Sequence, residues 1–168
     1  MVRVVVTGGS GKLGRAVVTH LLDSGYEVVN LDRAPSPQGD PRATFLRIDL
    51  TDYGQVAEAL TVVDDRYSRV DAVVHLAAVP APGIVTNSAT FANNVPSTYN
   101  VFAAARAAGI TNVVWASSET VLGLPFTETP PPFLPAGEER RCAPTRPTRW
   151  ARRWRRRWRA TSPPGTPT

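Results

Sequence analysis

The stretch that decides the fold is Val2–Gly14, which reads VRVVVTGGSGKLG. Its apolar run ends at Thr7, four glycines follow, and a helical pattern then covers residues 15–22. The order of strand, glycine-rich turn and helix is typical of a dinucleotide-binding unit. The free N–H groups and the positive dipole end at such a helix start attract a pyrophosphate. The alternative is a glycine-rich turn that binds no ligand.

Three of the glycines have separate tasks in this interpretation. Gly8 permits the tight turn, Gly11 lets backbone N–H groups approach the phosphates, and Gly14 lets the helix pack close to the strand. The pattern also requires an acid about 20 residues further on, and Asp32 follows the second apolar run. Its carboxylate would accept the ribose hydroxyls and repel a 2′-phosphate, which predicts NAD as the cofactor. Because Arg33 could accommodate a 2′-phosphate, NADP stays an alternative cofactor. The alternative interpretation of Asp32 is a turn residue without a ligand.

Further motifs follow in order: Asp49-Leu50, His75-Leu76-Ala77-Ala78, Asn94-Val95 and Ser117-Ser118-Glu119-Thr120-Val121. With the glycine turn, they make the chain resemble the N-terminal part of an extended short-chain dehydrogenase/reductase. The family is that of the NAD-dependent epimerases/dehydratases, which includes nucleotide-sugar 4-epimerases. The resemblance covers Met1 to about Pro135. It implies an oxidoreductase that, in the intact parent, transfers hydride between a sugar hydroxyl of a nucleotide-sugar-like substrate and NAD, with a homodimer as one possible assembly.

The resemblance also assigns site residues. The expected cofactor-binding residues are Gly8, Gly11, Lys12, Leu13, Gly14, Asp32, Arg33, Asp49, Leu50, Ala77, Ala78, Val79, Asn94 and Ser117. Asp49 and Asn94 could each be a helix cap instead, and the two serines could simply end a strand. His75 is interpreted as a packing residue, because a histidine without a paired acid is not a proton-transfer site. No metal site is expected.

The catalytic assignment is incomplete. Ser118 matches the family hydroxyl that binds the substrate oxygen, although Leu122 stands where a tyrosine is common. The family base is a tyrosine followed four residues later by a lysine on one helix face; the ammonium lowers the pKa of the phenol. Lys12 is the only lysine in the chain, and no tyrosine has a lysine four residues on. The chain as written is therefore expected to be inactive, and a non-catalytic dinucleotide-binding fragment is the second hypothesis.

The pattern of elements predicts an α/β fold, a Rossmann-like doubly wound parallel sheet of about five strands that is incomplete. Apolar runs without alternation indicate strands covered on both faces, and their alternation with helices implies right-handed crossovers. The expected strands are 2–7, 26–31, 44–48, 72–76 and 112–116. The expected helices are 12–24, 53–67 and 91–108, the last beginning near Pro96 or bending there.

Charge divides the chain into a domain, 1–135, and a tail, 136–168. Residues 1–139 hold 9 basic and 14 acidic residues, whereas residues 140–168 hold 10 arginines and no acid, so the net charge of +5 describes neither part. The tail is expected to be disordered, because its Arg, Pro and Thr content buries little apolar area. Cys142 is the only cysteine. With no signal peptide or membrane span in the pattern, a cytoplasmic protein is expected.

A shift of reading frame near 139–142 would explain the tail. In the neighbouring frame, each Arg-Trp pair becomes an aliphatic residue, and Tyr-Ala-Leu-Gly-Lys becomes possible from Thr148 to Arg152. The competing interpretation is a basic amphipathic helix carrying Trp150, Trp154 and Trp158, able to lie on anionic membrane or stack on nucleic acid. We expect neither a nucleic-acid nor a membrane partner.

Overall fold

The computed structural model describes residues 1–61, 69–81 and 83–118. The elements in chain order are β1 (Arg3–Thr7), α1 (Lys12–Asp23), β2 (Glu27–Asp32), β3 (Thr44–Arg47), α2 (Tyr53–Thr61), β4 (Ala72–His75), α3 (Asn87–Ala107) and β5 (Asn112–Trp115). The chain divides into two compact units. One comprises 1–80 and 92–116 and holds the whole sheet; the other comprises 81–91 and 117–168.

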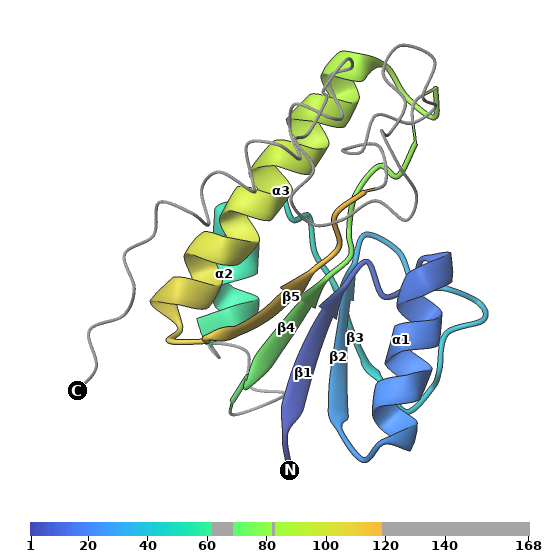
Figure 1. Ribbon diagram of the computed structural model, residues 1–168, viewed down its shortest axis with the longest axis vertical. Helices are drawn as coiled ribbons and strands as arrows, with labels where there is room; N and C mark the ends of the chain where they lie inside the picture. Colours follow the sequence, from blue (N-terminus) through green and yellow to red (C-terminus); the bar gives the residue numbers. More distant parts are fainter. Residues whose placement is uncertain (62–68, 82, 119–168) are drawn as a thin grey trace, which may run out of the picture. The chain divides into compact units, whose positions relative to one another are not determined.

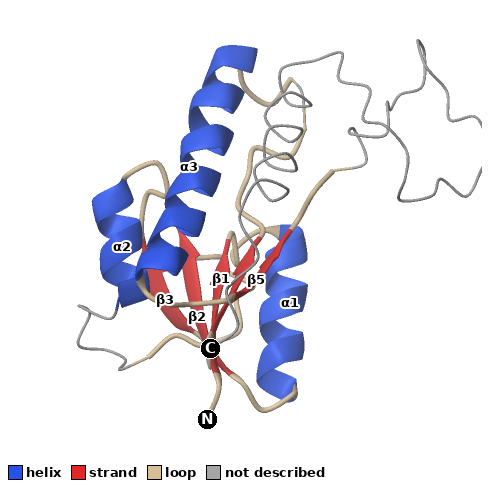
Figure 2. Cartoon of the chain, turned by 60° about the vertical axis from the view of Figure 1, so that its left-hand side comes forward, coloured by secondary structure: helices blue, strands red, loops and turns tan. Residues whose placement is uncertain are grey.

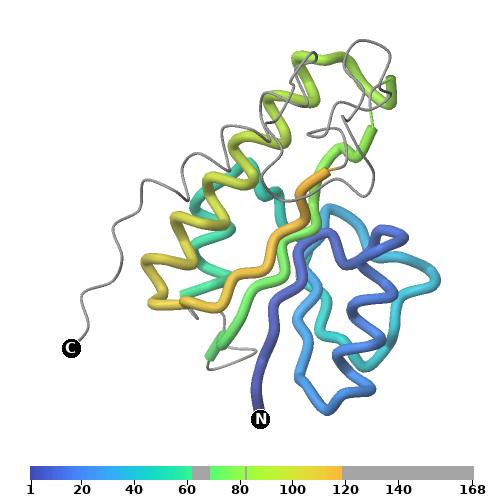
Figure 3. Tube along the Cα trace, in the orientation of Figure 1, coloured from blue at the N-terminus to red at the C-terminus, as the bar shows by residue number. Residues whose placement is uncertain are grey.

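The five strands form one parallel sheet in the order β3-β2-β1-β4-β5. The strand order reverses at β1, where the chain crosses from the β2 side to the β4 side, and this is the doubly wound arrangement that the sequence predicts. Helix α1 covers one face, and α2 and α3 cover the other (Figures 1 and 2). Because all strands are parallel, their carboxyl ends lie on the same side of the sheet. The turn after β1, the end of β2 and the segment after β4 therefore lie close together there (Figure 3).

Two apolar clusters hold the layers together. The larger one packs Val5, Leu31 and Val73 of the sheet against side chains of α2 and α3 such as Leu60 and Val101. The smaller one packs the opposite face, including Val6, against Val18 of α1. Each fully buried aliphatic side chain contributes about 1.5–3 kcal/mol. The central strands thus bury apolar side chains on both faces, as their valine-rich sequences predict.

Strand β5 departs from that pattern. Its residues alternate between exposed and half-buried, and Val114 is 66% exposed. Trp115 packs edge-on against Phe102 of α3, with ring centroids 5.7 Å apart. The apolar run alone indicates cover on both faces, but nothing that follows it in the sequence suits a covering helix, so an exposed edge or an uncovered face is expected here. The structure agrees, because no described helix lies over the α1 side of the sheet at this edge.

The predicted element ends need small corrections, and α3 a larger one. It begins at Asn87 rather than 91 and continues through Pro96 without ending there. The earlier start has a local cause: the Thr86 side chain accepts the N–H of Ala89 at 3.3 Å, and its carbonyl accepts that of Thr90 at 2.9 Å. Thr86 is therefore the N-cap of α3. Helix α2 ends at Thr61 in the described residues, and the predicted continuation to 67 lies outside them. The tail, 136–168, also lies outside the described residues.

Candidate dinucleotide site

At two positions of the turn, any side chain larger than that of glycine would clash with the backbone. Gly8 has a φ of +72°, and a Cβ there would lie 2.7 Å from the backbone N of Ala77. A Cβ on Gly14 would lie 2.1 Å from the carbonyl oxygen of Gly8, so only glycine lets α1 approach β1 this closely. These two contacts agree with the tasks that the sequence assigns to Gly8 and Gly14.

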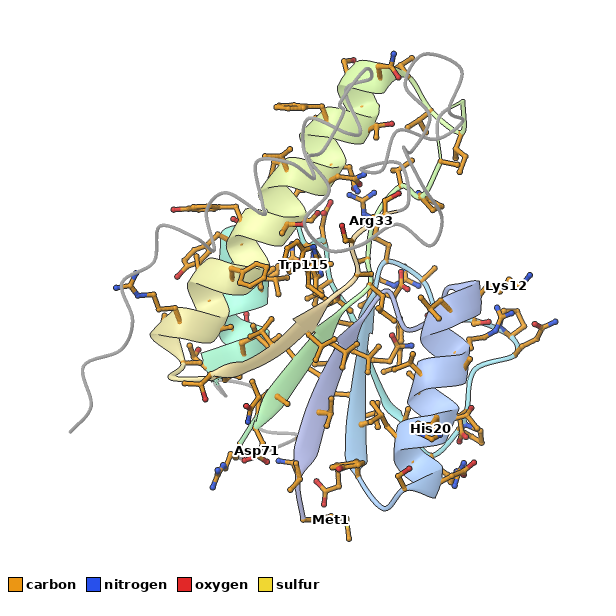
Figure 4. All side chains as sticks on the ribbon, in the orientation of Figure 1. Met1, Lys12, His20, Arg33, Asp71 and Trp115 are labelled. Carbon is orange, nitrogen blue, oxygen red and sulfur yellow. The ribbon has the colours of Figure 1, made fainter. Side chains whose placement is uncertain are left out.

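The N-terminus of α1 is open to a ligand. Gly11 is its N-cap with no side-chain hydrogen bond, and the first turn holds no acidic residue. A Cβ on Gly11 would meet only the Gly8 carbonyl oxygen, at 3.3 Å. Lys12 and Leu13 are exposed, and the Lys12 side chain extends away from the sheet (Figure 4). Free N–H groups, the helix dipole and space for close approach are the features that bind a phosphate anion.

Asp32 at the end of β2 is tied to this turn. Its Oδ2 accepts the backbone N–H of Ser10 at 3.0 Å, and its Oδ1 accepts that of Arg33 at 2.7 Å. The carboxylate can accept about two further hydrogen bonds, which suits two ribose hydroxyls. Asp32 thus lies where the sequence predicts, half-buried and beside the glycine turn.

A second carboxylate follows β3. Asp49 Oδ1 lies 3.0 Å from the Nη2 of Arg33 and also accepts the N–H and the hydroxyl of Thr51, at 2.9 and 2.8 Å. The Thr51 N–H, with help from that hydroxyl and from Arg33, lowers the pKa of Asp49 below its ordinary value. Asp49 is not the helix cap that the sequence left open: Asp52 caps α2 by accepting the N–H of Gly54 at 2.8 Å.

The segment after β4 is held from α3. Asn94 is buried; its Oδ1 accepts the N–H of Val79 at 2.8 Å, and its Nδ2 donates to the Val79 carbonyl at 3.1 Å. Asn94 therefore lies inside the helix and fixes the backbone of the loop, which excludes the helix-cap alternative. Ala77 and Ala78 are half-buried beside the glycine turn. The neighbouring Asn100 donates to the carbonyl of Leu50 at 2.9 Å, so α3 also supports the loop after β3.

His75 has the structural role that the sequence predicts. It is 1% exposed, with its Nδ1 2.7 Å from the hydroxyl of Thr7 and its Nε2 3.0 Å from the hydroxyl of Thr98.

Ser117 and Ser118 belong to the second compact unit. Both are half-buried. Among the described residues, the Ser117 hydroxyl is buried with no hydrogen-bond partner, and such a group is uncommon. The contact of Ser118 with a substrate remains a prediction.

Sequence reasoning missed two residues that shape the site. Gly9 is buried, and a Cβ there would lie 2.3 Å from the Oδ1 of Asn30. Asn30 in turn donates to the Ser10 hydroxyl at 3.2 Å, while its own Oδ1 has no partner in the part of the chain that the structure describes. The available signal was a polar residue in the otherwise apolar central strand EVVNLD. Asn30 joins β2 to the turn and so supports the bond between Ser10 and Asp32.

The described residues hold neither a cluster of three metal-ligating side chains nor a helix long and apolar enough to cross a bilayer.

The sheet order, the glycine turn and the acid after β2 together define a Rossmann-type dinucleotide-binding protein. The chain belongs to the NAD dependent epimerase/dehydratase family, whose model matches residues 4–149. That match extends beyond Pro135, where the sequence resemblance was expected to stop. The family is NAD-dependent, in agreement with the predicted cofactor.

Three relatives show the range of the family. A UDP-glucose 4-epimerase of Klebsiella pneumoniae is 32% identical over an alignment of 143 residues that covers 76% of this chain and 99% of that protein. A 3-beta-hydroxysteroid dehydrogenase of Mycolicibacterium neoaurum is 35% identical over 121 residues, 71% of this chain and 33% of that protein. The crystal structure of a short-chain dehydrogenase/reductase superfamily protein from Agrobacterium tumefaciens with bound NAD is 32% identical, with a TM-score of 0.72 over 89% of this chain and 42% of that one.

The chain thus spans nearly all of the Klebsiella protein but less than half of the other two relatives.

Proposed function

We propose that this chain binds NAD at the carboxyl edge of β1, β2 and β4 and forms the cofactor-binding portion of an oxidoreductase. The observation that carries the proposal is the hydrogen bond from Ser10 N–H to Asp32 at the open N-terminus of α1. The bond holds the open helix start next to a carboxylate, which supports a proposed pyrophosphate site beside a proposed ribose site. The Agrobacterium relative, with NAD bound and 32% identity, supports the same assignment.

Each part of the cofactor has residues that fit it. The backbone of Gly8, Gly11 and Gly14, with Lys12 and Leu13 beside it, would hold the pyrophosphate. Asp32 and Arg33 would face the adenosine ribose, and Asp49 with Leu50 the adenine. The segment Ala77–Val79, held by Asn94, would form the opposite wall. Ser117, in the second compact unit, stays a predicted cofactor contact. When bound, NAD supplies the hydride acceptor.

We further propose that the intact parent acts on a nucleotide sugar. The support is the Klebsiella relative, a UDP-glucose 4-epimerase covered over 99% of its length. Ser118 would bind the sugar oxygen that loses or gains a proton. A hydroxysteroid is the second candidate, because a 3-beta-hydroxysteroid dehydrogenase is 35% identical over the same region. A homodimeric parent and a cytoplasmic location complete the proposal, on the sequence grounds given above.

This chain lacks the Tyr-x-x-x-Lys pair, so we propose cofactor binding without turnover. A charge placed at the start of α1 tests the binding site. Gly11→Asp should abolish NAD binding in calorimetry, because a carboxylate there would repel the pyrophosphate. Ala16→Asp is the matched control, since it adds the same charge at an exposed position further along the same helix. Equal NAD affinity in Gly11→Asp and Ala16→Asp would contradict the proposed site.

A further inference from the structure

Three buried side chains from three elements form one hydrogen-bonded row. Thr7 ends β1, His75 ends β4, and Thr98 lies on α3; they are 0%, 1% and 3% exposed. The imidazole lies between the two hydroxyls, at 2.7 Å from Thr7 Oγ1 and 3.0 Å from Thr98 Oγ1. Both ring nitrogens are thus engaged, and the ring is fixed in position and orientation.

The hydrogen bonds of this row define the relative positions of its three side chains more narrowly than apolar packing would. A neutral imidazole has one donor and one acceptor, and a hydroxyl can take either role, so this triple can be satisfied without water. A leucine of similar volume would bury at least as much apolar surface without needing any partner. The polar triple therefore fixes the relative position of β1, β4 and α3, which apolar contact alone would leave adjustable.

Each end of the row leads to a wall of the proposed cofactor site. Thr7 immediately precedes Gly8, and its hydroxyl also accepts the N–H of Ala77 at 3.4 Å. The glycine turn is in contact with the segment after β4 here, since a Cβ on Gly8 would lie 2.8 Å from the Cα of Ala77. Thr98 lies one helical turn beyond Asn94, which makes two hydrogen bonds to the Val79 backbone.

We propose that His75, through Thr7 and Thr98, is a positioning residue for NAD: it sets the distance between the glycine turn and the Ala77–Val79 wall. The row is buried beneath that wall, and its members act on the cofactor through the backbone. The inference rests on the proposed function, because it concerns the affinity for NAD. Its signature is a loss of NAD affinity in a chain that is still folded.

The first experiment uses a matched pair of variants at Thr98, the member of the row that lies on α3. Thr98→Val keeps the shape and removes the hydroxyl, whereas Thr98→Ser keeps the hydroxyl. In calorimetry on folded protein, NAD should bind Thr98→Val about tenfold more weakly, the effect of losing one hydrogen bond of about 1.4 kcal/mol. Thr98→Ser should bind close to the wild-type affinity. Urea midpoints measured separately show how much stability each variant loses.

The second experiment measures the imidazole resonances of His75 in the wild-type chain, so it does not depend on a variant that fails to fold. The chain has two histidines, and His20 is exposed on α1. In ¹H–¹⁵N spectra of the imidazoles, NAD should shift the His75 resonances and leave those of His20 nearly unchanged. A His20→Gln chain assigns the two signals.

The outcomes separate the two proposals. A wild-type chain that does not bind NAD overturns the proposed function and this inference together. A wild-type chain that binds NAD, with an unshifted His75 or with unchanged affinity in Thr98→Val, overturns the inference alone.

Discussion

The backbone N–H of Ser10 donates to the Oδ2 of Asp32 over 3.0 Å, which joins the glycine turn to the end of the neighbouring strand. One hydrogen bond therefore connects the proposed phosphate and ribose sites. In the proposed site, the carboxylate would accept the ribose hydroxyls and disfavour a 2′-phosphate, and this determines the expected choice of cofactor.

Asp32→Asn should narrow the preference for NAD over NADP by about 1–2 kcal/mol, because the charge is lost while an acceptor for Ser10 N–H remains. Asp32→Ala should lose that acceptor as well and weaken NAD binding further. Calorimetry with both dinucleotides measures the two effects. A wild-type chain that binds NADP as tightly as NAD would contradict the assignment of Asp32.

The glycine turn predicts a contrast in stability between two alanine variants. Gly14→Ala would bring a methyl group 2.1 Å from the Gly8 carbonyl oxygen, and the free energy of unfolding should fall by about 2–4 kcal/mol through overpacking. Gly11→Ala, with its nearest atom at 3.3 Å, should cost about 1 kcal/mol, as at other N-caps. Urea unfolding gives both values, and equal losses would show that α1 can move away from β1.

Acid should weaken the loop that follows β3. The pKa of Asp49 is lowered from 3.8, chiefly by the Thr51 N–H. A carboxyl group with a lowered folded-state pKa contributes stability above its unfolded value, and that contribution disappears as pH falls through the folded value. Asp49→Asn should therefore be less stable than wild type at neutral pH, and the difference should vanish well below pH 3.8. A difference in urea midpoint that persists in acid would assign the effect to something other than the carboxylate charge.

Turnover on nucleotide sugars should be undetectable. The residues four places after Tyr26, Tyr53, Tyr67 and Tyr99 are Asn30, Ala57, Asp71 and Ala103, so no phenol has a lysine beside it on a helix face. NADH absorbance in the presence of UDP-glucose measures this, with Ser118→Ala as the control. NADH formation above that control would mean that another residue supplies the base.

A nucleotide sequence whose neighbouring frame cannot encode Tyr-x-x-x-Lys near Thr148 would rule out the frameshift hypothesis.

The exposed edge at β5 should make the chain marginally stable and prone to aggregate. Val114 is 66% exposed on an edge strand, and such a strand can pair with another chain. Val114→Lys should reduce light scattering at high protein concentration with little change in unfolding midpoint. Val113→Thr is the matched variant, and it should lower the midpoint because Val113 packs against the larger core cluster.

A monodisperse wild-type monomer that unfolds cooperatively well above the usual mesophile range of about 45–65 °C would contradict this prediction of marginal stability.

The local part of the site could be predicted from sequence because it depends on neighbouring residues. The run Val2–Thr7 followed by Gly8, Gly11 and Gly14 specifies strand, turn and helix within thirteen residues, and the spacing to Asp32 adds the acid. Polar residues within apolar strands indicated the supporting contacts of the site less clearly than the glycine spacing indicated the turn. His75 was correctly assigned to packing, whereas Asn30 passed unnoticed.

Only the tertiary structure decided which residues from other elements contact the glycine turn and the segment opposite it. Asn94 and Val79 are 15 residues apart in sequence, and Thr7 and His75 are 68 apart. Periodicity describes which face of an element is apolar, but it does not say which polar side chain meets which backbone group across the sheet. The parallel pairing of β1 with β4 brings Thr7 beside His75, and the position of α3 then places Asn94 against Val79. The sequence determined that a dinucleotide-binding turn forms; the packing of α3 on the sheet determined the wall opposite it.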